Sequence, residues 1–439
     1  MPDPLHDRHQ MAGALRLIER EAESYLREID QALVRPLREG PLDPELPIAG
    51  VGSLQALTEL VAIARDGATG SAGPRFFHFV MGGGTPAALG ADWLTSTLDQ
   101  NAYNWISSPL GARLEQISTN WLKELFGLPR DWSAVITTGA TMANFAGLAV
   151  ARRWWGMQHG LDIDNRGFSG LPPVPVFASG YLHASAVKAL GMLGIGRQQP
   201  QLVTKDAAGR VDLVGLEVAL KALGGKPAIL IATAGDVNTG DFDPVSDMAG
   251  LARKHGAWLH VDGAFGLFAA VSPTTRHLVD GVESADSVAV DGHKWLNVLR
   301  AYGRDGYRAM VERHLSLAQR IAYQVDAAPE LERLAAVPLG QLAHDGRRRR
   351  PDRSGRAGAR LEASLYGAGT LIGGRPESAG FGVGGSVPDS IACSSRRAIR
   401  FISRSPRSRR FTICSRISSW CIRWFIRALS SSSDLTLSS

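Results

Sequence analysis

Short apolar segments alternate with helical ones between residues 134 and 291, and this alternation constrains the fold more than any other feature. Strands that are apolar on both faces are typical of parallel sheets, because the helical crossovers of these sheets cover both sides. We therefore predict an α/β fold with a mostly parallel sheet covered by helices. Such sheets bind ligands beyond the carboxyl ends of their strands. The predicted strands are Ala134–Thr138, Val174–Ala178, Pro227–Thr233, Ala257–Asp262 and Ser287–Asp291.

The regions on either side of this core have different patterns. Residues 1–75 predict N-terminal helices and an extended arm, with an amphipathic helix over 11–39 and a second over 53–64. Residues 305–339 predict two helical pieces that are broken near Pro329. After Leu339 no periodic pattern persists, so we expect no regular structure in the segment 340–439.

The charges and cysteines are unevenly distributed. The last hundred residues contain 18 arginines, no lysine and six acidic residues, and they hold all three cysteines of the chain. The remaining body is mildly acidic and free of cysteine, which excludes a disulfide framework or a cysteine-based metal site there. A basic tail of this kind could bind nucleic acid, but we do not expect this partner because selected basic tails mix lysine with arginine.

The chain shows no long uncharged apolar segment, so no membrane span is expected. Its first residues contain no apolar stretch after the charged ones, so no secretory signal is expected either. The sequence therefore predicts a cytoplasmic protein.

Two residues at predicted strand ends could perform chemistry. Lys294 lies in Asp291-Gly-His-Lys-Trp-Leu-Asn297, where a lysine is either solvated or able to form a Schiff base. The neighbouring His293 and Trp295 and the upstream acid favour the second interpretation. Asp262 ends another strand and could keep a pyridine nitrogen protonated, or it could be a helix N-cap.

Three further motifs have weaker meaning by themselves. His183 precedes a predicted helix and could stack on a flat ring, or it could cap that helix. Thr137-Thr-Gly-Ala-Thr141 opens a helix after a strand, where backbone N–H groups and the helix dipole attract phosphate. Gly82-Gly-Gly84 is interpreted as a structural turn, since no helix start of the phosphate-binding type follows it.

Together these segments resemble the group II amino acid decarboxylases, which depend on pyridoxal 5'-phosphate (PLP) and have the fold-type I architecture. The family includes aromatic-amino-acid and glutamate decarboxylases. The resemblance is carried above all by His260-Val-Asp-Gly-Ala264 and by Asp291–Asn297, and it covers roughly residues 10–339. The stretch Ala234–Gly240 is most similar to a bacterial branch of the family.

The resemblance implies a role for each candidate. Lys294 would form the Schiff base with PLP, Asp262 would pair with the pyridine nitrogen, and His183 would stack on the ring, which makes these three the catalytic residues. The expected substrate is a small molecule, an L-amino acid that loses carbon dioxide, and the expected assembly is a homodimer. No metal is expected. The implied cofactor-binding set is Gly139, Ala140, Thr141, His183, Asn238, Thr239, Asp262, Ala264, Asp291, His293 and Lys294.

The chain departs from the family pattern after Val298, where a core strand and a loop with a catalytic tyrosine are expected and a later helix follows at once. We therefore interpret 76–298 as an incomplete PLP-binding large domain and 299–339 as the remnant of a truncated small domain. The composition of 340–439 is that of a GC-rich gene translated out of frame, so we hypothesise a frameshift near residue 340. The alternatives to decarboxylation are another PLP reaction, such as transamination, and a non-catalytic remnant of the fold.

Overall fold

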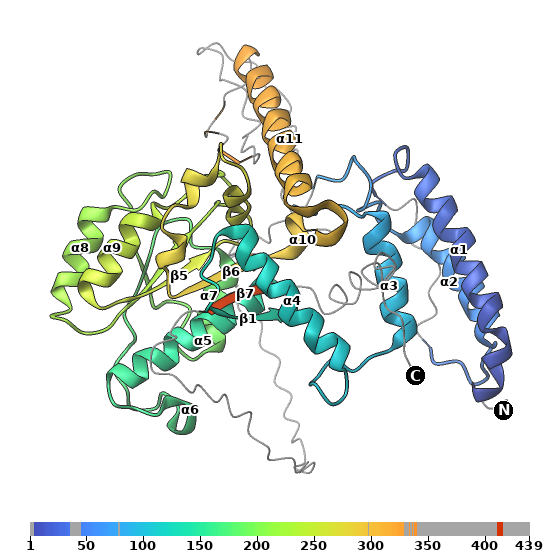
Figure 1. Cartoon of the computed structure of the whole chain (residues 1–439), viewed down its shortest axis with the longest axis horizontal. Helices are drawn as coiled ribbons and strands as arrows, with labels where there is room; N and C mark the ends of the chain where they lie inside the picture. Colours follow the sequence, from blue (N-terminus) through green and yellow to red (C-terminus); the bar gives the residue numbers. More distant parts are fainter. Residues whose placement is uncertain are drawn as a thin grey trace, which may run out of the picture.

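Seven strands pair in parallel in one sheet, in the order β1-β7-β6-β5-β4-β2-β3, in the computed structural model of the chain (Figure 1). The structure describes residues 4–35, 45–77, 80–296, 298–328, 333, 336, 338–339 and 411–415. The parallel pairing of every neighbouring pair confirms the predicted α/β fold. The strands are β1 (Ser133–Thr137), β2 (Val176–Ala178), β3 (Pro200–Leu202), β4 (Ile229–Thr233), β5 (Trp258–Asp262), β6 (Ser287–Asp291) and β7 (Phe411–Ser415).

Two apolar clusters lie on opposite faces of the sheet, because successive side chains of a strand point to opposite sides. Leu230 of β4 belongs to the cluster with α4, α8 and α9, whereas Ile231 belongs to the cluster with α5 and α7. The helices are α1 (Met11–Glu28), α2 (Ser53–Gly67), α3 (Pro86–Leu98), α4 (Pro109–Phe126), α5 (Ala140–Gln158), α6 (Ile163–Arg166), α7 (Ala184–Met192), α8 (Leu213–Ala222), α9 (Val245–His255), α10 (Gly292–Trp295) and α11 (Leu299–Ala327).

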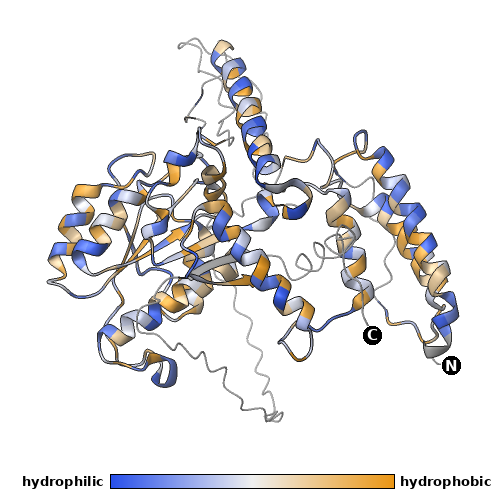
Figure 2. Ribbon diagram, in the orientation of Figure 1, coloured by the Kyte–Doolittle hydropathy of each residue, from blue (hydrophilic) through white to orange (hydrophobic). Residues whose placement is uncertain are grey.

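The N-terminal helices α1 and α2 stand apart from the sheet and pack against each other (Figure 1). The Nε atom of Arg65 on α2 donates to the carboxylate of Glu21 on α1 over 2.7 Å. Neither helix contains a buried residue, although both carry hydrophobic stretches (Figure 2), and Leu15, Leu26 and Leu60 are exposed. The prediction of a helix over 11–39 was too long, because α1 ends at Glu28, ahead of the proline-rich arm.

Strand β7 corrects the expectation that the segment 340–439 contributes no regular structure. Its residues Phe411–Ser415 pair with β1 on one side and with β6 on the other. The segment Phe-Thr-Ile-Cys-Ser is short and rich in β-branched and aromatic residues, which favour strands. It supplies partners for backbone groups of β1 and β6 that would otherwise be unpaired in the sheet. The other residues of 340–439, and with them the frameshift hypothesis, lie outside the described residues.

Helix α11 begins earlier than the sequence predicted, at Leu299 rather than near residue 305. Gly303 interrupts it with non-helical backbone angles (φ 60°, ψ −174°), so one helical turn precedes the long segment that projects from the sheet in Figure 1. Glycine tolerates this positive φ without a steric cost. The predicted break near Pro329 lies outside the described residues, although α11 ends just before it, at Ala327.

A buried carboxylate ties together the loops that follow β2 and β4. Oδ2 of Asp243 accepts hydrogen bonds from the hydroxyl of Ser179 and from the N–H of Thr233, both over 2.8 Å. Its Oδ1 atom is buried and has no partner among the described residues. Burial, helped by the nearby charges of Asp241 and Asp236, therefore raises the pKa of Asp243 to about 6.

We predict that Asp243→Asn removes a pH-dependent cost to stability. An acid whose pKa is raised on folding favours the folded state at low pH, and this contribution is lost as the pH rises from about 4 through 6. The unfolding free energy of the variant relative to that of the wild type should rise by roughly 2 kcal/mol between pH 4.5 and pH 7. Urea unfolding of both proteins at these two pH values, one on each side of the shifted pKa, measures this change. Asp280→Asn, at an exposed carboxylate, is the control, and an equal difference at both pH values would contradict the prediction.

Candidate active site

The carboxyl ends of β4, β5 and β6 lie side by side at one edge of the sheet, because these strands are parallel neighbours. The N–H of Gly263 donates to the carbonyl of Ala289 over 2.9 Å, and the N–H of Asp291 donates to the carbonyl of Ala264 over 3.2 Å. These bonds fix the turn after Asp262 against the end of β6. The structure therefore brings together the two segments that the sequence analysis selected.

Asp262 is a buried carboxylate held by two donors. It is 4% exposed, and its Oδ2 atom accepts a hydrogen bond from Nδ2 of Asn144 over 2.9 Å. Its Oδ1 atom accepts one from the N–H of Ala264 over 3.2 Å. Asp262 does not cap a helix, since the next one, η2 (Gly266–Val271), has Phe265 at its N-cap. A carboxylate fixed in this way can keep a basic ring nitrogen protonated.

His183 is the N-cap of α7, so the capping interpretation is part of its role. Its Nδ1 atom accepts from the N–H of Ser185 over 3.1 Å and lies 2.7 Å from the hydroxyl of the same residue. The residue is nevertheless exposed. The contacts hold one edge of the imidazole and leave the ring accessible to a flat partner.

The N-terminus of α5 presents free backbone donors. Gly139 is the N-cap, with φ 145° and ψ 165°, and no side chain caps the N–H groups of the first turn, which begins with Ala140 and Thr141. A Cβ atom at Gly139 would meet nothing within 4 Å, so the space beside the turn is open. Uncapped N–H groups and the positive end of the helix dipole make such a position suitable for phosphate.

Lys294 lies in the short helix α10, directly after β6. Asp291 caps this helix by accepting from the N–H of His293, and its carboxylate also lies 3.5 Å from Nε2 of that histidine. Lys294 is partly exposed, whereas the adjacent Trp295 is buried. Trp295 stacks on Phe268 with the ring centroids 5.7 Å apart, so the core anchors the turn that carries the lysine.

Gly82 is a site residue whose role the sequence analysis missed. Its N–H donates to the carbonyl of His293 over 2.8 Å, and a Cβ atom at this position would lie 2.9 Å from the carbonyl oxygen of Lys294. Only glycine allows this close approach. A helix does begin shortly after this turn, but the side chain of Thr85 caps α3 and Pro86 is its first residue, so its start differs from the uncapped one of α5. Thr-Pro is a known helix-start signature that could have indicated this.

Asn238 and Thr239 lie in the loop after β4, at the same sheet edge. The buried carboxylate of Asp236 accepts from both of their N–H groups, over 3.0 and 2.7 Å, and from the hydroxyl of Thr239. The loop adjoins the site because the N–H of Ala234 donates to the carbonyl of Asp262 over 2.9 Å. Asn238 itself is exposed.

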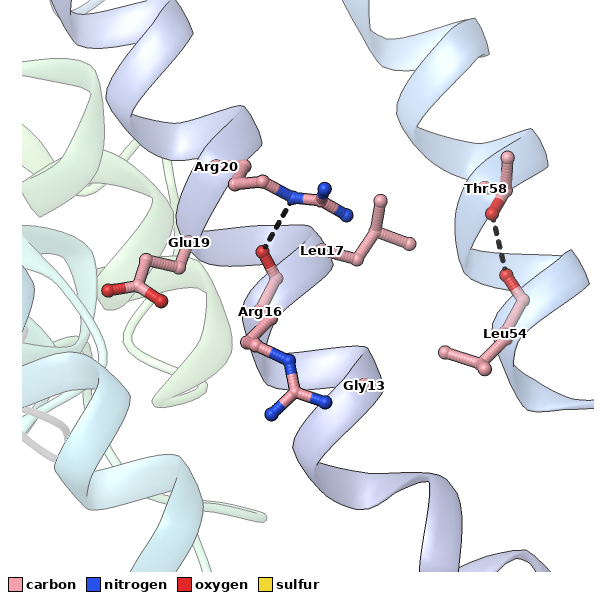
Figure 3. Close-up of a pocket in the computed structure, with 7 residues that line it drawn as sticks. All are labelled: Gly13, Arg16, Leu17, Glu19, Arg20, Leu54 and Thr58. Carbon is pink, nitrogen blue, oxygen red and sulfur yellow. Dashed lines mark hydrogen bonds between the residues drawn. The ribbon is translucent and has the colours of Figure 1, made fainter.

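Other parts of the molecule offer less chemistry. A hollow of about 500 Å³ lies between α1 and α2, and none of the predicted site residues lines it (Figure 3). Within the described ranges, no three His, Cys, Asp or Glu side chains gather as metal ligands do. Of the helices described, none combines the length and the apolar character that crossing a membrane requires.

The sequence also resembles proteins of known activity. Human cysteine sulfinic acid decarboxylase is 34% identical over 262 residues, which cover 58% of this chain and 51% of the relative. The mouse acidic amino acid decarboxylase GADL1 is 33% identical over 226 residues, or 51% of this chain and 40% of the relative. The chain thus spans about half the length of the curated relatives it matches.

Solved structures share the fold at lower identity. The Oryza sativa TDC with PLP and tryptamine matches with a TM-score of 0.70 at 22% identity, over 77% of this chain and 83% of the other. Mouse CSAD in its apo form matches with a TM-score of 0.67 at 23% identity, over the same shares. Residues 36–299 match the profile of the pyridoxal-dependent decarboxylase conserved domain. With this match spanning more than half of its length, the chain belongs to the pyridoxal-dependent decarboxylase family.

Proposed function

We propose that this chain is a PLP-dependent carboxy-lyase that acts on an L-amino acid, with Lys294, Asp262 and His183 as its catalytic residues. The observation that carries the proposal is the position of Lys294 one strand away from a buried carboxylate, Asp262, at a shared sheet edge. Human cysteine sulfinic acid decarboxylase, which resembles the chain, supports an amino acid as the substrate class.

The residues at this edge fit PLP group by group. The uncapped N-terminus of α5 and the open space beside Gly139 suit the phosphate. The accessible ring of His183 suits the flat pyridine, and the amine of Lys294 suits the aldehyde. The carboxylate of Asp262 suits the ring nitrogen. When bound, PLP supplies an electron sink for the bond between the α-carbon and the carboxylate of the substrate.

The protein residues then bind, orient and hold protons. Asp262 keeps the proton on the ring nitrogen, because a buried carboxylate favours a cation beside it. Asp291 holds the lysine turn by capping α10, and Gly82 holds it from the other side through the carbonyl of His293. Ala264 donates its N–H to Asp262 and carries only a methyl group, the smallest side chain that could pack against a ring.

A second candidate is a protein that binds PLP without turnover. Val298 leads directly into α11. The loop whose tyrosine returns a proton in the family would be expected after this position. Tyr307 is 1% exposed and lies in the core, which leaves it unavailable for this role. Because α11 begins directly after Val298, we also propose that the large domain, residues 76–298, is truncated at this position.

We also propose that the chain forms a homodimer through α1 and α2. Both helices lack buried residues while exposing large apolar side chains, among them Leu15, Tyr25, Leu26 and Leu60. An apolar surface of this kind marks a protein interface, and a second copy of the same helices is self-complementary. A cytoplasmic location belongs to the proposal as well, because residues 1–339 contain no cysteine that would need an oxidising compartment.

The first prediction concerns cofactor attachment. Purified full-length chain incubated with PLP should show visible absorbance, and borohydride reduction should leave the label on Lys294, as peptide mass spectrometry detects. Lys294→Ala should abolish the label. Lys188→Ala, at an exposed lysine on α7, should retain it and serves as the control. Label that is scattered over surface lysines, or that persists in Lys294→Ala, would contradict the proposal.

The second prediction concerns turnover. A panel of L-amino acids should include one from which the chain releases carbon dioxide without forming a keto acid. Asp262→Asn should lower this rate roughly ten- to a hundredfold, because a hydrogen bond to a charged group contributes about 1.5–3 kcal/mol. Keto acid as the main product would identify transamination. PLP binding without any product would instead support the non-catalytic candidate.

The third prediction concerns assembly. Leu26→Glu on α1 should raise the dissociation constant of the dimer at least tenfold. A tenfold change corresponds to about 1.4 kcal/mol, and burying the glutamate charge in the interface costs more than that. Val218→Glu, on the exposed face of α8, is the matched control and should leave the dimer intact. Sedimentation velocity over a concentration series measures both variants. A wild-type chain that stays monomeric at all concentrations would refute the assembly.

A further inference from the structure

A chain of hydrogen bonds runs through the interior behind the candidate site and ends on Asp262. Nε1 of Trp258 donates to the hydroxyl of Ser287 over 3.0 Å, and this hydroxyl lies 2.8 Å from Nδ1 of His260. Nε2 of His260 lies 2.9 Å from Oδ1 of Asn144. Nδ2 of Asn144 donates to Asp262 over 2.9 Å. All five residues are buried, and His260, Ser287 and Asn144 are fully so.

The chemistry of the groups fixes the direction of every bond in this chain. An ionised carboxylate only accepts, so the amide NH₂ of Asn144 must face Asp262, and its oxygen must face His260. Nε2 of His260 therefore carries the proton. Burial lowers the pKa of His260 to about 4, so the ring is neutral at ordinary pH and its Nδ1 atom accepts from the hydroxyl of Ser287. The indole of Trp258 can only donate, which closes the chain at its other end.

A branch of the same chain reaches His183. The NH₂ group of Asn144 also donates to the hydroxyl of Ser185 over 3.1 Å. This hydroxyl then directs its own proton to Nδ1 of His183, 2.7 Å away, and the N–H of Ser185 points to the same nitrogen. Nδ1 of His183 is therefore an acceptor, and the proton of the neutral ring lies on Nε2.

Tight packing holds the chain in place. Asn144 lies on α5, and one turn later on this helix is Gly147, where a Cβ atom would come within 2.7 Å of Cε1 of His260. Helix α5 can lie this close to β5 only because Gly147 has no side chain. The amide of Asn144 thus meets His260 and Asp262 without freedom to move away.

We propose that Asn144 is a positioning residue of the cofactor site, whose single amide orients the carboxylate of Asp262 and, by directing the hydroxyl of Ser185, strengthens the hydrogen bonding that holds Nδ1 of His183. This inference rests on the proposed function, since it assigns Asn144 to the two residues proposed to contact the ring nitrogen and the ring face. It predicts that one side chain controls both residues, Asp262 by a direct hydrogen bond and His183 through the hydroxyl of Ser185. The seven hydrogen-bonded side chains behave as one unit because the donor and the acceptor of each bond between them are fixed.

The experiment is nitrogen NMR of the histidine rings in full-length chain labelled with ¹⁵N-histidine and free of PLP. The spectra distinguish a protonated ring nitrogen from a bare one, and glutamine substitutions of His183 and His260 assign the signals. The wild type should show both rings as fixed Nε2–H tautomers. Asn144→Leu should convert His260 to an averaged signal and shift the Nδ1 signal of His183, whereas Ser185→Ala should shift the Nδ1 signal of His183 alone, because the N–H of Ser185 still points to that nitrogen. Asn165→Leu, at an exposed asparagine that bonds Asp162 over 2.6 Å, is the matched control and should change neither ring.

A second measurement connects the chain to the cofactor. Asn144→Leu should raise the dissociation constant for PLP about tenfold, and Asn165→Leu should leave it unchanged. If Asn144→Leu does not fold, Ser185→Ala still tests the branch to His183. This variant removes only the hydroxyl that accepts from Asn144 and leaves the bond between Asn144 and Asp262 in place. An averaged His183 signal in the wild type, or an Nδ1 signal of His183 that is unchanged in both Asn144→Leu and Ser185→Ala, would overturn the inference even if PLP labels Lys294. A wild type with fixed tautomers that binds no PLP would overturn the proposed function, and with it the cofactor role of Asn144.

Discussion

The parallel pairing of β4, β5 and β6 is the constraint on which the site depends. Parallel neighbours all end at the same edge of the sheet, so the residues that follow these strands meet there however far apart they are in sequence. Asp262, Asp291 and the loop of Asn238 are brought together in this way. The backbone bonds between the turn after Asp262 and the end of β6 then fix the spacing between the carboxylate and the lysine segment.

The continuity of the sheet depends in turn on a distant segment. Without β7, the strands β1 and β6 would each present unpaired N–H and C=O groups to the interior, and each such group costs about 1–3 kcal/mol. The residues Phe411–Ser415 pair with both neighbours and complete the sheet beneath α5. The position of α5 matters for the site, because no side chain caps its N-terminus and its residue Asn144 donates to Asp262.

The predictability of each feature follows from the range of the interactions behind it. The five predicted strands lie within two residues of those observed, because continuous apolar segments carry the information locally. The role of Gly82 could not be recognised in this way, because a glycine is required there by the close approach of Lys294, more than two hundred residues later in the sequence. Asn144 is one polar residue in an otherwise apolar stretch of helix, and nothing near it in sequence indicates its partners on β5 and α7. The capping interpretation of His183 is confirmed, because one ring nitrogen caps α7, whereas the stacking interpretation stays a prediction for a ring that remains exposed.

Two buried carboxylates near the same sheet edge show how the surroundings separate structural from chemical roles. Asp243 accepts two hydrogen bonds on one oxygen, and the other oxygen has no partner within the described chain, which explains why burial raises its pKa. Asp262 accepts one donor on each oxygen, and one of these donors, Asn144, is itself fixed by a buried histidine. Asp243 therefore connects two loops at a cost that depends on pH. Asp262, by contrast, is held in a defined orientation at the end of a strand, which is the property that a partner for a cationic ring nitrogen requires.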